Sequence, residues 1–201
     1  MNDTMNTEER IDKEFNIETS KRDATKEDDH HRAYEATPYD VLDLLAEEGV
    51  INRDDVLVDM GCGKGRAGFY LSNRIGCRVK GIEYSEELYQ LALQNQQNLK
   101  KKADTQFLCM NAENYEVQKE DNVFFFFNPF SIEILRSVIA NIEKSYYENR
   151  REIKLIFYYP SMEYVGYLLT KENIEFIDEI DCSHLYKKNK ERECLLLFRI
   201  F

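Results

Sequence analysis

The sequence predicts an α/β protein with a doubly wound sheet of seven strands, mostly parallel, and helices on both faces. Apolar strand-like runs alternate with helical segments from residue 56 to residue 172, which is the pattern of such sheets. The run NVFFFF (122–127) is almost continuously apolar, as in a strand buried on both faces. The run VLVDM (56–60) leads directly into a glycine-rich loop. Ligands of doubly wound sheets bind beyond the carboxyl ends of the strands, so this loop is the first candidate site.

Each predicted element follows from its local pattern of apolar residues, caps and breakers. Ser85 is suited to cap the second helix after the loop, and the last two strands are expected to form an antiparallel pair through the turn at 187–191. The predicted strands are 56–60, 77–84, 105–110, 122–127, 152–160, 173–181 and 192–201. The predicted helices that alternate with them are 64–75, 85–102, 131–150 and 161–172.

The N-terminal segment differs from the rest of the chain in composition. Residues 1–31 contain ten acidic residues, five Lys or Arg, and only six apolar ones. Such a segment cannot bury enough surface to fold alone, so we expect a flexible acidic arm, with the folded domain spanning 32–201. The arm could instead fold over the site when substrate binds. A helix is predicted after it, with Thr37 as N-cap, Pro38 in the first turn and Gly49 at its end.

Composition restricts the class of protein. The 201 residues carry a net charge of −11, which argues against a large basic surface for nucleic acid. No apolar run approaches the ~18 residues of a membrane span, and no apolar leader is seen, so a cytoplasmic location is expected. No metal site is predicted, because the histidines and cysteines lack ligand spacing. The five cysteines are Cys62, Cys77, Cys109, Cys182 and Cys194.

The loop after the first strand places three glycines at alternate positions. Gly61, Gly63 and Gly65 allow the sharp turn into a helix and a close approach of backbone to a ligand. A phosphate-binding P-loop requires GxxxxGK[ST], and the glycine after Lys64 excludes it. The dinucleotide pattern GxGxxG is matched from Gly63 to Gly68, two residues late relative to the strand, so a nicotinamide dinucleotide remains open.

The segment 56–66 resembles the first motif of class I, Rossmann-like methyltransferases that use S-adenosylmethionine (SAM), in which a hydrophobic strand ends in Asp/Glu-x-Gly-x-Gly-x-Gly. The resemblance implies that Asp59 organises the loop near the methionine amino group. It further implies that the backbone from Gly61 through Cys62 to Gly63 lies under the methionyl part and the ribose. A carboxylate suits this cationic end of SAM and would repel a pyrophosphate.

The ends of the second and third strands supply further candidate cofactor residues. Glu83 can accept hydrogen bonds from both ribose hydroxyls in either cofactor family, and Tyr84 could pack on an adenine. Asn111 and Ala112 stand where the family usually has an Asp-Ala pair that contacts the adenine edge. Asparagine departs from that pair but can still bond an exocyclic amine.

Asn128, Pro129 and Phe130 follow the fourth strand, at the position that faces the transferred methyl group in this family. The segment is similar to the Asp/Asn/Ser-Pro-Pro-aromatic motif of amine-methylating members, but it lacks one proline. The resemblance implies that the polar side chain and a proline carbonyl would orient an acceptor nitrogen for in-line transfer, and that the aromatic Phe130 would pack against the acceptor. A simple turn into the next helix is the alternative.

The segment before the predicted N-terminal helix is similar to that of small bacterial methyltransferases of unassigned substrate, and more distantly to protein-lysine methyltransferases. The residues that carry this likeness, Tyr34, Thr37 and Tyr39, are therefore expected to cover the SAM site. The sequence as a whole predicts an enzyme that transfers a methyl group from SAM, leaving S-adenosylhomocysteine (SAH), to a nitrogen of a protein lysine or small amine rather than to nucleic acid. The rival interpretations are an NAD-dependent oxidoreductase and a non-catalytic SAM-binding module.

Overall fold

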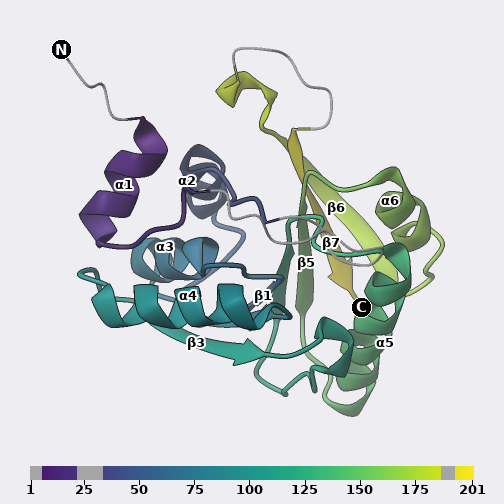
Figure 1. Cartoon of the computed structure of the whole chain (residues 1–201). Coiled ribbons are helices and arrows are strands. Elements are labelled where there is room, and N and C mark those ends of the chain that lie inside the picture. Colours follow the sequence, from purple (N-terminus) through teal and green to yellow (C-terminus); the bar gives the residue numbers. More distant parts are fainter. Residues whose placement is uncertain (1–5, 22–33, 187–192) are drawn as a thin grey trace.

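The computed structural model describes residues 6–21, 34–186 and 193–201, which form a seven-stranded sheet in the order β3-β2-β1-β4-β5-β7-β6 (Figure 1). Strands β1 to β5 are parallel, and β7 runs antiparallel to both of its neighbours. This confirms the predicted doubly wound sheet and its antiparallel C-terminal pair, whereas the turn at 187–191 lies outside the described residues. The strands are β1 (Val56–Met60), β2 (Arg78–Glu83), β3 (Asp104–Cys109), β4 (Val123–Phe126), β5 (Ile153–Tyr158), β6 (Ile174–Asp181) and β7 (Cys194–Ile200).

The helices divide between the two faces of the sheet, and each face has its own apolar core. One core contains side chains from α1, α2, α3 and α4, and the other contains side chains from α5 and α6. Neighbouring residues of β4 point to opposite faces, with Phe125 in the first core and Phe124 and Phe126 in the second. The helices are α1 (Thr7–Phe15), α2 (Tyr39–Glu47), α3 (Arg66–Ile75), α4 (Glu86–Asn98), α5 (Ile132–Glu148) and α6 (Met162–Leu168), with short 3₁₀ turns η1 (Ala112–Asn114) and η2 (Ser183–Leu185).

The order of the strands reverses at β1, which lies between β2 and β4. At this point the register aligns Met60 with both Ile82 and Phe126, so the three strands end at one level of the sheet. The glycine loop leaves from this level. The candidate site is therefore positioned at the place where doubly wound sheets bind their ligands.

The N-terminal segment is packed, not loose, over residues 7–20. Asn6 caps α1 with its side chain, and Ile11, Phe15 and Ile17 are buried in the first core. The Phe15 carbonyl accepts a hydrogen bond from the Lys100 backbone N–H at 3.0 Å. The expectation of a flexible arm is wrong for these residues, because the few apolar side chains lie on one face of a helix and the sheet domain provides the surface that buries them.

The start of α2 also differs from the expectation. Its N-cap is Pro38, and no side chain caps it, so Thr37 is not the cap. The predicted end is close, because Gly49 follows the C-cap with a φ of +66°. Ser85 caps α4 as expected, by accepting a hydrogen bond from the Leu88 N–H. Within the part of the chain that the structure describes, no helix combines the length and apolar character that crossing a bilayer requires.

We expect Phe15→Ala to lower the free energy of unfolding by about 3 kcal/mol, because the ring is buried in the first core and its removal leaves a cavity. Urea unfolding followed by circular dichroism measures this. Lys13→Ala, at an exposed position of the same helix, is the matched control and should change stability by less than about 0.5 kcal/mol. Equal and small effects of both substitutions would show that α1 is not docked.

Candidate functional site

The glycine loop turns away from β1 through three residues with positive φ, which are +88° at Gly61, +54° at Gly63 and +85° at Gly65. The backbone N–H groups of Gly61 and Cys62 both donate to the Ile82 carbonyl, at 2.9 and 3.0 Å, and tie the loop to the end of β2. These bonds fix where the loop begins. Burial raises the pKa of the Cys62 thiol well above its usual value, so this side chain stays neutral.

Two carboxyl groups lie beneath the loop. Glu83 accepts one hydrogen bond from the Gly63 N–H and another from the Ser85 N–H, both at 2.8 Å, and so links the loop to the start of α4. Asp59 is 4% exposed, and burial together with the nearby charge of Glu83 raises the pKa of its carboxyl to about 7. A cationic group placed beside Asp59 would remove this cost of ionisation.

The Tyr34 ring lies against the glycine loop. A Cβ atom on Gly63 would overlap the Tyr34 ring, so only glycine allows this contact. The Lys64 ammonium lies 5.0 Å from the centre of the same ring. Thr37 and Tyr39 are placed differently, because both are buried away from solvent. The Thr37 carbonyl accepts a 3.3 Å hydrogen bond from Arg66.

Tyr39 is a core residue in this structure. Its side chain is fully buried, its ring packs edge-on against Tyr70, and its hydroxyl donates to Asp12 at 2.6 Å. The Arg66 guanidinium lies 4.4 Å from the centre of its ring. Such a residue can support the site only indirectly, through Arg66 and Asp12, since it has no surface to offer a cofactor.

The ends of β2 and β3 form the outer part of the site. The register pairs Glu83 with Cys109, and the Met110 N–H donates to the Glu83 carbonyl at 2.9 Å. Tyr84 is 51% exposed, so its ring is accessible to a ligand. Asn111 precedes η1, and its Oδ1 is buried with no hydrogen-bond partner among the described residues. A buried acceptor of this kind is costly unless a ligand donor completes it.

Asn128, Pro129 and Phe130 leave the end of β4 beside the loop. The Pro129 Cβ would lie 2.5 Å from a Cβ on Gly61, so this proline approaches the glycine backbone directly. Asn128 has a φ of +41°, and its Oδ1 is buried without a partner among the described residues. Phe130 is buried in the second core, where its carbonyl accepts a hydrogen bond from the Tyr164 hydroxyl. The expected packing of Phe130 against an acceptor is therefore replaced by a structural role.

The structure adds residues that the motifs did not indicate. Phe107 of β3 fills the space left by both Gly65 and Gly81, and a Cβ on either glycine would lie within 2.7 Å of its ring. Arg66, the first residue of α3, is 4% exposed and surrounded by polar partners. No local sequence pattern indicated the role of Arg66, because its polar partners come from segments far away in the sequence.

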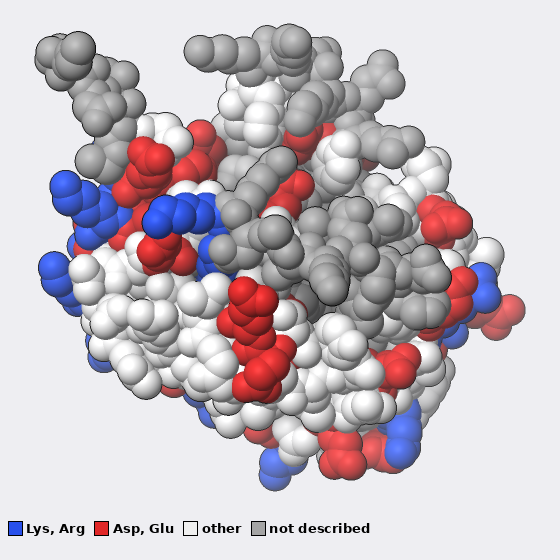
Figure 2. Space-filling view, in the orientation of Figure 1, with Lys and Arg blue, Asp and Glu red and all other residues white. Residues whose placement is uncertain are grey.

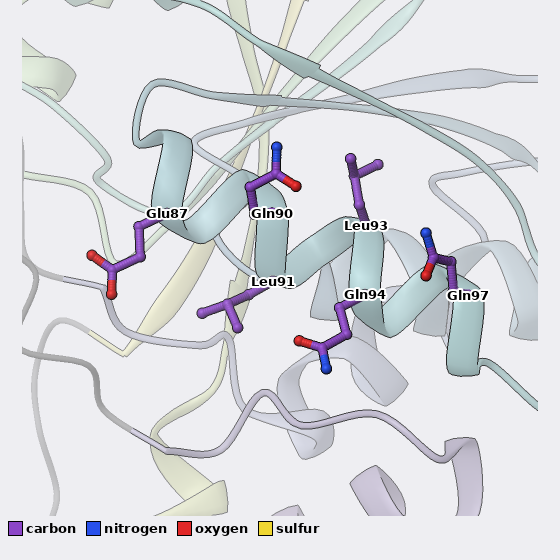
Figure 3. A pocket seen from close by; sticks show the side chains of 6 residues that line it. All are labelled: Glu87, Gln90, Leu91, Leu93, Gln94 and Gln97. Atoms are coloured by element: carbon purple, nitrogen blue, oxygen red, sulfur yellow. The ribbon is translucent and has the colours of Figure 1, made fainter.

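A separate surface groove of about 430 Å³ runs along α4 (Figure 3). All six of its described lining residues belong to this helix, and none is a glycine-loop residue or a candidate identified from the sequence. They are Glu87, Gln90, Leu91, Leu93, Gln94 and Gln97. The groove is therefore distinct from the site at the strand ends.

Comparison with known proteins agrees with this geometry. Residues 57–145 match the family model described as methyltransferase domain. A putative methyltransferase from Escherichia coli has a similar structure, with a TM-score of 0.62 and 20% identity over 83% of this chain and 89% of that one. An RNA methyltransferase from Salinibacter ruber, solved with SAH, gives a TM-score of 0.54 and 18% identity over 83% of this chain and 94% of that one.

A short stretch is also similar to the histone-lysine N-methyltransferase, H3 lysine-79 specific, of Dictyostelium discoideum. The two are 43% identical over 44 residues, which are 22% of this chain and only 2% of that protein. Residues 57–145 are thus similar to a methyltransferase domain, and the chain shares the fold of these methyltransferase structures. The cofactor of class I, Rossmann-like methyltransferases is SAM.

The residues present fit this cofactor on two counts. A cationic partner would stabilise the ionised form of the buried Asp59 carboxyl, and SAM carries two positive groups. The unpartnered Oδ1 of Asn111 offers an acceptor to an exocyclic amine. When bound, SAM supplies an activated methyl group on a sulfonium.

We expect the affinity for SAH to fall about tenfold between pH 8 and pH 6, because the Asp59 carboxyl, with a pKa of about 7, must lose its proton to pair with the amino group of the ligand. The sign follows from the raised pKa: the free protein holds the proton at pH 6, and binding has to release it. Calorimetric titration at several pH values measures the dependence. Asp59→Asn is the control, and its weaker binding should be nearly independent of pH in this range. A flat profile for the native chain would contradict the assignment.

Proposed function

We propose that this chain transfers the methyl group of SAM to a nitrogen atom of a cationic amine, either a protein lysine or a small amine. The observation that carries the proposal is the Asn128 side chain. Its Oδ1 is buried and unpartnered among the described residues, and the next residue, Pro129, contacts Gly61 of the loop. An acceptor oxygen is therefore available next to the segment that would hold the methyl donor.

The backbone at the ends of β4 and β5 supports a functional role for this corner. Asn128 and Tyr159 are both non-glycine residues in the left-handed region, with φ of +41° and +50°. Phe127 and Tyr158, which precede them, pack with their ring centres 4.7 Å apart. Backbone strain of roughly 1–3 kcal/mol per residue persists where surrounding packing enforces it, and it concentrates at functional sites.

The chemistry required of these residues is orientation. The cationic amine first loses a proton to solvent. The Asn128 Oδ1 would then accept a hydrogen bond from an N–H of the neutral amine and so direct the lone pair of the amine nitrogen at the methyl carbon. The new N–C bond forms as the C–S bond breaks, and the electron pair of that bond returns to sulfur. The methylated ammonium that results then loses a proton to solvent. No general base is needed at the transfer step once the amine is neutral.

Charge supports an amine over nucleic acid. The chain carries a net charge of −11, and the face shown in Figure 2 has acidic side chains spread among neutral ones, without a broad basic patch in its described part. A negative surface attracts a cationic amine and repels a phosphate backbone.

We expect calorimetry to show binding of SAM and SAH but not of NAD, and we expect Glu83→Ala to weaken SAH binding by more than tenfold. The carboxylate holds the Gly63 and Ser85 N–H groups, and its loss releases the loop. Glu87→Ala, exposed in the first turn of α4, is the matched control and should bind SAH as the native chain does. Binding of NAD without SAH would favour the oxidoreductase interpretation and overturn the proposal.

We expect Asn128→Ala to lower kcat for amine methylation by 10- to 100-fold and to change SAH affinity by less than threefold, because the side chain acts on the acceptor. Transfer of labelled methyl from SAM to a lysine-rich peptide, a small primary amine and an RNA measures both the rate and the preferred acceptor. Asn111→Ala should show the reverse pattern, with weaker SAH binding, and Asn73→Ala on the surface should change neither. Methylation of RNA alone, or no transfer at all, would overturn the proposed acceptor.

A further inference from the structure

The packed N-terminal segment 6–21, called the strap below, is organised around one buried carboxylate. Asp12 is 5% exposed and accepts hydrogen bonds from the backbone N–H and the hydroxyl of both Thr19 and Ser20, at 2.7 to 2.9 Å. The Tyr39 hydroxyl donates a fifth bond at 2.6 Å. Burial opposes ionisation of Asp12, but these bonds outweigh it, and the pKa of the carboxyl lies below its usual value.

The same cluster holds the residue that follows the glycine loop. Arg66 donates from Nε to the Thr19 hydroxyl at 2.6 Å and from a terminal nitrogen to the Ser20 hydroxyl at 2.8 Å. It also pairs with Glu8 of α1 and lies 3.7 Å from Asp12. Since Arg66 is bonded covalently to Gly65, every one of these contacts restricts the position of the loop.

Two further contacts join the strap to the loop itself. Asn95 of α4 accepts from the Glu18 N–H at 2.9 Å and donates to the Lys64 carbonyl at 3.1 Å. The Lys64 ammonium in turn donates to the Lys21 carbonyl at 2.8 Å. The backbone and the side chain of Lys64 are thus both held through the strap.

The strap also positions the ring that covers the loop. The Tyr34 hydroxyl donates to the Thr19 carbonyl at 2.9 Å, while its ring lies against Gly63. Thr19 therefore sits between Asp12, Arg66 and Tyr34, and its position sets that of the Tyr34 ring. A ligand on the loop would meet this ring at a place that the strap determines.

We propose that Asp12 is a positioning residue for the cofactor: through Thr19 it fixes Arg66 behind the glycine loop and Tyr34 above it, so that the strap is an integral wall of the cofactor site. The proposal rests on the proposed function, because it takes the loop as the place where the cofactor binds.

A role in packing alone would not require this arrangement. Buried polar networks contribute little net stability compared with apolar residues of the same volume, but they specify one geometry, because each unpaired donor is costly. Here one carboxylate satisfies five donors from three residues, and two of these residues also accept hydrogen bonds from Arg66. Replacement of Asp12 by asparagine would leave N–H groups facing other donors and would release the cluster.

The test is SAH titration of the full chain at a temperature where circular dichroism shows each variant folded. We expect Asp12→Asn to weaken SAH binding at least tenfold. Glu14→Gln, which alters an exposed ion pair with Lys101 on the outer side of the same helix, should leave binding unchanged. Thr19→Ser should bind like the native chain and Thr19→Val more weakly, because only serine keeps the hydroxyl that donates to Asp12 and accepts from Arg66.

Tyr34→Phe provides a variant that leaves the carboxylate in place if Asp12→Asn fails to fold. It removes only the bond to the Thr19 carbonyl, and we expect it to weaken binding two- to tenfold. The double variant should lose less binding free energy than the sum of the losses in Tyr34→Phe and Thr19→Val, since both substitutions act through one cluster. Lower melting temperatures with native SAH affinity in Asp12→Asn, or in both Thr19→Val and Tyr34→Phe, would overturn the proposal and leave the strap a purely structural element. Failure of the native chain to bind SAH would instead overturn the proposed function.

Discussion

The site depends on one steric constraint. Three segments approach the backbone of the glycine loop so closely that a side chain on the loop would overlap them. Pro129 from the end of β4 contacts Gly61, and the Tyr34 ring contacts Gly63. Both glycines have positive φ, so any other residue would be strained as well as obstructed. The loop therefore contacts the segment after β4, the Tyr34 ring that the N-terminal strap holds, and β3. Movement of any of these segments would change the space beside the loop.

Electrostatics adds a second requirement to the same loop. Asp59 and Glu83 bring two carboxyl groups together under it, and burial disfavours the ionised form of Asp59. Because the pKa in the folded chain lies above the usual value, this group makes the ligand-free protein less stable as the pH rises towards 7. A bound cation would relieve the cost. The protein thus holds an unfavourable interaction at the loop where the proposed cofactor would bind, which is typical of sites built for binding rather than for stability.

The strap shows where composition misleads. Residues 1–31 are rich in charge, and a charged segment with few apolar residues is ordinarily loose. In residues 7–20 those charges are structural: Asp12 is buried among hydroxyl and amide donors, and Glu8 pairs with Arg66. The few apolar side chains, including Phe15, complete the first core. A segment can be unable to fold alone and still be well packed when another part of the chain supplies both its apolar surface and its counter-charges.

The sequence by itself determined the sheet, its glycine loop and the candidate positions at the ends of its strands. Patterns of apolar residues, glycines and caps are local, and the predicted segments agree closely with the strands and helices observed. Only the tertiary structure decided which side chains face a ligand: it brought Tyr34 onto Gly63, and it buried Tyr39 and Phe130 in the cores. It also decided that Asp12 and Arg66, 54 positions apart, form one cluster. The physical reason is that burial and charge pairing depend on contacts between distant segments, which a local pattern does not encode.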